Sequence, residues 1–175
     1  VIVAVMLVAP EVVLILGGKE YYESRIVVLP LLACTFFTFL YLLPSTTEYY
    51  LKKTWNIAFA TSCIAVLNII LNYFFIKQFG YIAGAYTTLF CYICYFLFHY
   101  LMAKKLIGFQ QFDTKIIAIL AVLLFAVLAV CYVLLDLLVV RWTLMILFVS
   151  VNVLLLLKLY KTGKLKGLVG EKNNE

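Results

Sequence analysis

Six long apolar runs, separated by short polar breaks, make up almost the whole sequence. They cover residues 1–16, 26–47, 55–76, 81–103, 116–135 and 139–157. As an α-helix, residues 55–76 would be roughly 33 Å long, which is enough to cross the hydrocarbon core of a bilayer. Residues 1–16 are too few for a full span, and we expect them to be the end of a helix that begins upstream. The pattern predicts an all-α, polytopic membrane helix bundle with one partial and five full transmembrane helices.

The composition also indicates a membrane protein. Apolar residues make up 67% of the chain and charged residues 13%, and the mean hydropathy is +1.13. A typical soluble domain has about 25% charged residues. A chain with so few charged residues could not keep its apolar side chains away from water in a soluble fold. The net charge of +6 comes from basic residues at the ends of the runs and in the last segment. They form no clustered basic face, so we expect no nucleic-acid partner.

The basic residues also predict the orientation of the chain, because Lys and Arg are enriched in cytoplasmic loops. Alternate loops divide the 14 basic residues into ten on one side and four on the other. The ten are Lys52, Lys53, Lys104, Lys105, Lys115, Lys158, Lys161, Lys164, Lys166 and Lys172, and the four are Lys19, Arg25, Lys77 and Arg141. The carboxyl terminus is therefore expected in the cytoplasm. Residues 159–175 would form a basic tail against anionic membrane lipids.

The run 55–76 carries polar residues at a depth where polar side chains are costly in lipid. Thr61, Asn68 and Asn72 fall on one helical stripe. They could form hydrogen bonds between helices, or they could line a solvated transport cavity. Both interpretations place this helix inside a bundle.

The next run presents a second stripe, formed by Tyr92, Tyr95 and His99. His99 could simply be hydrogen-bonded or reach the membrane interface, or it could titrate and couple proton flow to movement. Glu48 precedes Lys52 by four residues, which favours an ion pair at the cytoplasmic end of the helix. An ion-coupling role for this carboxylate is the alternative.

We expect no catalytic residue, no metal site and no cofactor in this chain. Cys91 and Cys94 form a CxxC pair, but it lies within an apolar run and has no second pair or histidine cluster. The single histidine excludes most acid–base schemes, and the sequence has no phosphate-binding loop. The chain is therefore predicted not to be an enzyme.

Several short motifs occur in an order that resembles a known family. They are Ala9-Pro10, Gly17-Gly18 with Tyr21, Lys52-Lys53-Thr54, the segment Asn68 to Asn72, and the segment Phe79 to Thr88. Together they resemble the carboxyl-terminal half of Wzx-type oligosaccharide flippases, the polysaccharide biosynthesis members of the multidrug, oligosaccharidyl-lipid and polysaccharide exporter superfamily. The resemblance covers roughly residues 1–105. Residues 106–158 would be an additional transmembrane hairpin, which we expect to be tight and antiparallel.

This resemblance implies a function and a location. The chain would be the carboxyl-terminal lobe of a two-lobed transporter in the bacterial cytoplasmic membrane. By alternating access it would flip an undecaprenyl-pyrophosphate-linked oligosaccharide for synthesis of a lipopolysaccharide or exopolysaccharide. Glycan polymerase and glycosyltransferases would be its protein partners.

One departure from this expectation concerns charge. A pyrophosphate should attract cations, yet no Lys or Arg lies in the middle of an apolar run. The contact would then fall to Lys52 and Lys53 at the cytoplasmic mouth, or to the other lobe. Two alternatives remain open: a cation- or proton-coupled antiporter for drugs or small molecules, which should bury a carboxylate in a helix, and a non-transporting scaffold for glycan-assembly enzymes.

Overall fold

The computed structural model describes residues 2–108 and 113–161, and every element in this part of the chain is a helix. The elements are α1 (Ile2–Gly17), the short 3-10 helix η1 (Lys19–Ser24), α2 (Arg25–Tyr50), α3 (Thr54–Phe79), α4 (Ile82–Ile107), α5 (Thr114–Val133) and α6 (Leu138–Lys161). Five of these helices are long and apolar enough to cross a membrane, and α1 is shorter. The predicted all-α fold is confirmed, and the helix lengths are those of a membrane helix bundle.

The helices extend beyond the apolar runs that predicted them. α3 continues through Lys77 to Phe79, and α4 continues through Lys104 and Lys105 to Ile107. A basic side chain in the last turn interacts favourably with the helix dipole, so charge ends the apolar run without ending the helix. The helix ends are set by backbone conformation instead. Gly18 and Gly80 follow the carboxyl ends of α1 and α3 with φ of 73° and 76°, which only glycine adopts at little cost.

Pro30 and Pro44 both lie inside α2, which remains one helix from Arg25 to Tyr50. Pro44 has no N–H to donate to the backbone carbonyl of Leu40, and the hydroxyls of Ser45 and Thr46 do not take its place. Ser45 and Thr46 donate instead to the carbonyls of Leu42 and Leu43, at 3.0 and 2.6 Å. These two side chains therefore bond within their own turn.

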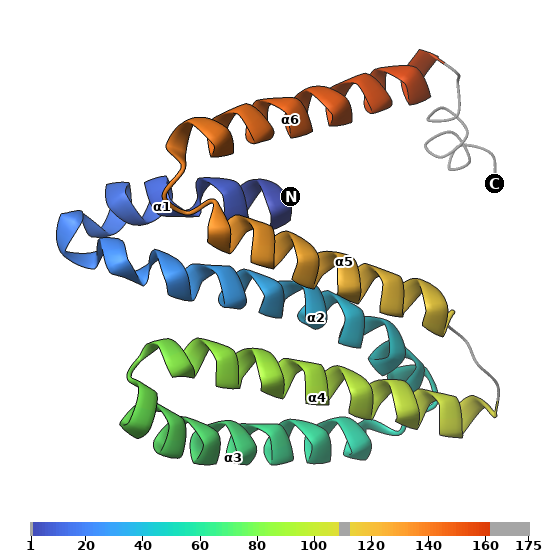
Figure 1. Cartoon of the computed structure of the whole chain (residues 1–175). Coiled ribbons are helices and arrows are strands. Elements are labelled where there is room, and N and C mark those ends of the chain that lie inside the picture. The colour runs from blue at the N-terminus through green and yellow to red at the C-terminus, as the bar shows by residue number, and fades with distance from the viewer. Residues whose placement is uncertain (1, 109–112, 162–175) are drawn as a thin grey trace. The chain divides into compact units, whose positions relative to one another are not determined.

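The structure separates into two compact units, Val1–Val133 and Leu134–Glu175. In the first unit α2 is central, because α1, α4 and α5 all pack against it, and α3 packs mainly against α4 (Figure 1). Phe37 of α2 joins three of these helices, with its ring centroid 6.4 Å from that of Phe96 on α4 and 6.2 Å from that of Phe125 on α5. Among the described residues of the second unit, α6 is the only helix.

The predicted domain boundaries rest on a sequence resemblance rather than on compactness, and they stay predictions. The sequence suggested a boundary after residue 105 and a separate hairpin at 106–158. In the structure, α5 belongs to the first unit, because it packs on α2 and α1. The tail predicted at 159–175 lies outside the described residues from residue 162 onward, and before that α6 continues to Lys161.

Candidate functional site

A chain of side-chain hydrogen bonds joins α3 to α4. The Thr87 hydroxyl donates to Oδ1 of Asn72, the Asn72 amide donates to Oδ1 of Asn68 at 2.9 Å, and the Asn68 amide donates to Oγ1 of Thr88 at 3.4 Å. The chain therefore starts and ends on α4 and passes through two amides of α3. Such bonds contribute about 0.6 to 2 kcal/mol each between membrane helices. The predicted interhelical role of Asn68 and Asn72 is thus present in the structure.

Gly84 explains how the two helices come close enough for these bonds. A Cβ atom at Gly84 would lie 3.2 Å from Cδ1 of Ile76 and 3.8 Å from Oδ1 of Asn72. Gly80 lies four residues before Gly84, and a Cβ atom built there has no atom within 4 Å. Gly84 therefore serves the close approach of the helices, whereas Gly80 serves the turn before α4.

Thr61 makes a second polar contact between α3 and α4. Its hydroxyl lies 2.8 Å from the hydroxyl of Tyr95. The Tyr95 ring in turn packs against Tyr41 of α2, with 4.6 Å between ring centroids. These contacts bring together side chains from three successive helices, α2, α3 and α4.

The space between these side chains is a groove of about 500 Å³, which we call the polar groove. It is lined by Tyr41, Thr61, Ile64, Ala65, Asn68, Ile69, Thr88, Cys91, Tyr92 and Tyr95. Hydroxyls, an amide and tyrosine rings alternate here with aliphatic side chains. Four of the predicted cavity residues therefore share one surface: Thr61, Asn68, Tyr92 and Tyr95.

The other two predicted cavity residues lie elsewhere. Asn72 is next to the groove in the hydrogen-bond chain but does not line it. His99 is fully buried, with 0% of its side chain exposed, and its Nδ1 lies 2.6 Å from Oε1 of Glu48, which is equally buried. The expectation that His99 is hydrogen-bonded is confirmed, and its side chain is buried within the protein.

The expected ion pair between Glu48 and Lys52 is wrong. α2 ends at Tyr50, so the helical i, i+4 geometry does not extend to Lys52. The Glu48 carboxylate points inward to His99, and Lys52 is exposed. Within the described chain, Oε2 of Glu48 and Nε2 of His99 have no hydrogen-bond partner.

Two tyrosines connect the buried pair to the polar groove. The His99 ring is stacked on Tyr41, with 5.9 Å between centroids, and meets Tyr95 edge-on at 4.6 Å. Both tyrosines also line the groove. Tyr41 and Tyr95 thus form part of the wall between the groove and the pair.

Lys52 and Lys53, the predicted cytoplasmic-mouth residues, form the turn between α2 and α3. The Lys53 backbone N–H donates to the Glu48 carbonyl at 2.8 Å, and the Lys52 N–H donates to the Tyr49 carbonyl at 3.0 Å. This pair of bonds is a Schellman motif. Both lysines are exposed, and neither lines the polar groove.

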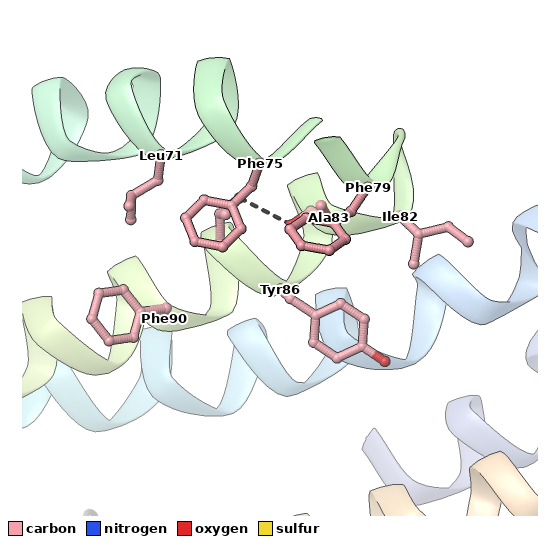
Figure 2. A pocket seen from close by; sticks show the side chains of 8 residues that line it. Leu71, Phe75, Phe79, Ile82, Ala83, Tyr86 and Phe90 are labelled. Carbon is pink, nitrogen blue, oxygen red and sulfur yellow. Dashed lines mark hydrogen bonds between the residues drawn. The ribbon is translucent and has the colours of Figure 1, made fainter. Parts of the chain in front are cut away.

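A second hollow between α3 and α4 is apolar and measures about 610 Å³. Figure 2 shows Phe75 and Phe79 of α3 facing Tyr86 and Phe90 of α4 around it. Its rings and aliphatic groups fit hydrocarbon better than a hydroxylated ligand. The two hollows therefore differ in chemistry along the same pair of helices.

The sequence analysis missed Tyr41 and Thr87. Tyr41 and Glu48 are seven residues apart and hence on one face of α2, which could have linked them. Thr87 carried no such signal, because its partner Asn72 lies on another helix.

No group of His, Cys, Asp or Glu in the described residues is arranged to hold a metal ion. No family model matches the chain, and it matches neither a curated protein nor a solved structure.

Proposed function

We propose that the chain is part of a membrane transporter that flips a lipid-linked oligosaccharide across the bacterial cytoplasmic membrane by alternating access. The polar groove is the observation that carries this proposal. It is a hydroxyl- and amide-bearing surface on helices that are long and apolar enough to cross a membrane. Polar side chains at membrane depth are retained where they face protein or a wet passage.

The groove suits a sugar chain better than an apolar drug. Thr61, Asn68 and Thr88 offer donors and acceptors for sugar hydroxyls, and Tyr92 and Tyr95 offer flat rings with polar ends. The groove holds no Lys, Arg, Asp or Glu among its lining residues. A neutral, many-hydroxyl ligand needs no charged partner, so this lining matches its chemistry.

The charged end of the carrier lipid would then bind elsewhere. In this proposal Lys52 and Lys53 meet the pyrophosphate at the cytoplasmic mouth, and the second lobe supplies further cations. Their exposure in the α2–α3 turn keeps both ammonium groups available to an anion. The basic carboxyl-terminal segment would lie on the same cytoplasmic side.

The test is translocation of lipid-linked oligosaccharide by the full-length protein in vesicles. Replacing Asn68 and Asn72 by Leu should lower the rate roughly tenfold or more while folded protein remains in the membrane. The groove loses the Asn68 amide, and it also loses the Asn72 amide that holds Asn68 by a hydrogen bond. Ser62→Leu is the matched control, since Ser62 lies on α3 beside Phe59 and Val66, away from the polar groove. Full activity of the double variant, or absence of translocation by the wild type, would contradict the proposal. The second result would favour a scaffold.

The cation- or proton-coupled antiporter is a second candidate, because the structure buries the carboxylate that this function requires. This carboxylate is Glu48, which is fully buried against His99 in the last turn of α2. Efflux of a small cationic drug driven by an ion gradient, with no flipping of lipid-linked oligosaccharide, would favour this function. The same vesicles serve for both measurements.

A further inference from the structure

We propose that the polar groove is a hydrogen-bond-accepting subsite, which binds sugars through donating hydroxyl or ammonium groups and rejects acidic sugars. This subsite rests on the proposed function and deepens it, because it defines the class of sugar that the groove selects. The selectivity comes from the hydroxyl protons of Thr61, Thr88 and Tyr95, which are already used in bonds within the protein.

The hydroxyls of Thr61 and Tyr95 act together on one side of the groove. Oγ1 of Thr61 donates to the Ile57 carbonyl at 2.8 Å and lies 2.8 Å from the Tyr95 hydroxyl. A carbonyl oxygen only accepts, and a hydroxyl has a single proton. The Thr61 proton therefore goes to Ile57, and Tyr95 donates to Thr61. Both oxygens keep lone pairs for a ligand, and neither keeps a proton.

Thr88 shows the same arrangement on α4. Its hydroxyl donates to the Gly84 carbonyl at 2.7 Å and accepts from the Asn68 amide at 3.4 Å. A bond from a threonine hydroxyl to the carbonyl of the preceding turn is common in helices. Because that carbonyl takes the proton, Thr88 presents only an oxygen lone pair to the groove.

The other polar groups of the groove can both donate and accept. Asn68 uses one N–H on Thr88 and one lone pair on the Asn72 amide, so it keeps one donor and one acceptor. Tyr41 and Tyr92 each add a hydroxyl to the lining, and the lining has no Lys, Arg or His within the described chain. Accepting positions therefore outnumber donating ones.

This imbalance favours a ligand that donates. A sugar hydroxyl can turn its proton toward these oxygens, and an ammonium group brings three protons. The rings of Tyr41, Tyr92 and Tyr95 also attract a cation through their electron-rich faces. We therefore expect the groove to bind both neutral sugars and amino sugars.

A carboxylate meets the opposite situation. It has acceptors only, so it would place its negative charge against the lone pairs of Thr61, Thr88 and Tyr95 with no cation beside them. A charge left without partners in a partly buried site is costly. Aliphatic side chains alone would penalise a carboxylate and an ammonium group alike. A preference between these two charged groups therefore reports the accepting character of the groove.

Binding of matched probes tests this preference. The probes are synthetic farnesyl-pyrophosphate disaccharides that differ only in whether the outer sugar carries a hydroxymethyl, an aminomethyl or a carboxylate group. At about pH 7 the amine is protonated and the carboxylate is ionised. Isothermal titration calorimetry on the full-length protein in detergent micelles should show the carboxylate probe binding roughly tenfold more weakly than the other two.

Lysine substitutions at neighbouring residues of α3 locate the effect in the groove. Ile69 lines the polar groove and is 69% exposed, so Ile69→Lys adds a cation to the lining. Ile70 is 47% exposed and lies beside Val66, away from the groove, so Ile70→Lys is the matched control. Ile69→Lys should bind the carboxylate probe at least as tightly as the aminomethyl probe, whereas Ile70→Lys should keep the wild-type order.

Translocation of the same disaccharides on undecaprenyl pyrophosphate in vesicles separates this subsite from the proposed function. Equal affinities for the carboxylate and aminomethyl probes overturn the subsite, even where all the glycans are translocated. An unchanged order of affinities in Ile69→Lys also overturns it. The expected order of affinities without translocation supports the subsite and contradicts the proposed flippase.

Discussion

Lys52 holds a backbone conformation that glycine normally adopts. Its φ is 56°, and it is the position after the helix cap in the Schellman motif that ends α2. For a residue with a Cβ this left-handed conformation costs roughly 1–2 kcal/mol. The adjacent Lys53 has a φ of −94° and bears no such cost.

This difference predicts the effects of two glycine substitutions. Lys52→Gly and Lys53→Gly both remove one exposed positive charge. Both also raise the conformational entropy of the unfolded chain by a similar amount. Only Lys52→Gly also relieves the left-handed strain. We expect the Lys52 variant to be more stable than the Lys53 variant by about 1 kcal/mol, measured by unfolding in mixed detergent micelles. Equal stabilities would show that the turn tolerates lysine without strain.

The contact between Glu48 and His99 shows where prediction from the sequence stops. Helical spacing places residues on faces of their own helix, and it correctly grouped Tyr92 and Tyr95 on one surface. It does not fix how one helix is rotated against another, and the two members of the pair are 51 residues apart. The sequence therefore offered Lys52 as the local partner of Glu48 and missed the distant one.

The helices themselves were predictable because length and hydropathy suffice to identify a membrane span. All six apolar runs became helices, and the three residues of α3 beyond residue 76 were missed because they include Lys77 and Gln78. The packing order was less predictable. Nothing in the apolar runs indicated that α2 would contact α1, α4 and α5 while α3 would pack mainly on α4.

The contact of α3 with α4 predicts a strong effect of a large residue at Gly84. Leucine there would collide with Ile76 and Asn72, since even a Cβ would lie 3.2 Å from Ile76 Cδ1. The helices would have to separate, and the Thr87–Asn72 hydrogen bond would be lost. We expect Gly84→Leu to destabilise the protein by about 1–3 kcal/mol, seen as a lower midpoint of thermal unfolding followed by size-exclusion chromatography.

Ala83→Leu is the matched control for this substitution. Ala83 is the preceding residue and lines the apolar hollow of about 610 Å³ (Figure 2), which has room for a larger side chain. Its stability should stay close to that of the wild type. If both variants lose stability equally, the close approach of α3 and α4 is not the reason that glycine occupies position 84.

The first compact unit has a definite two-ended organisation. The turn after α2 and the end of α4 lie at one end, and η1 and the turn from α3 to α4 lie at the other (Figure 1). Lys52, Lys53, Lys104 and Lys105 belong to the first end, and Lys19, Arg25 and Lys77 to the second. The basic residues are thus more numerous at the end that also contains the buried pair, and the positive-inside rule predicts that this end faces the cytoplasm.

This assignment predicts a labelling pattern in intact cells. Single cysteines at Lys53 and Asp113, in a background without other cysteines, should be shielded from a membrane-impermeant thiol reagent, whereas cysteines at Glu20 and Gln78 should react. All four side chains are exposed in the structure, so burial in the protein cannot explain a difference between them. Permeabilised cells provide the control, because all four positions should then react. Labelling of the Asp113 position from outside would reverse the orientation, and with it the expectation that Lys52 and Lys53 meet a substrate arriving from the cytoplasm.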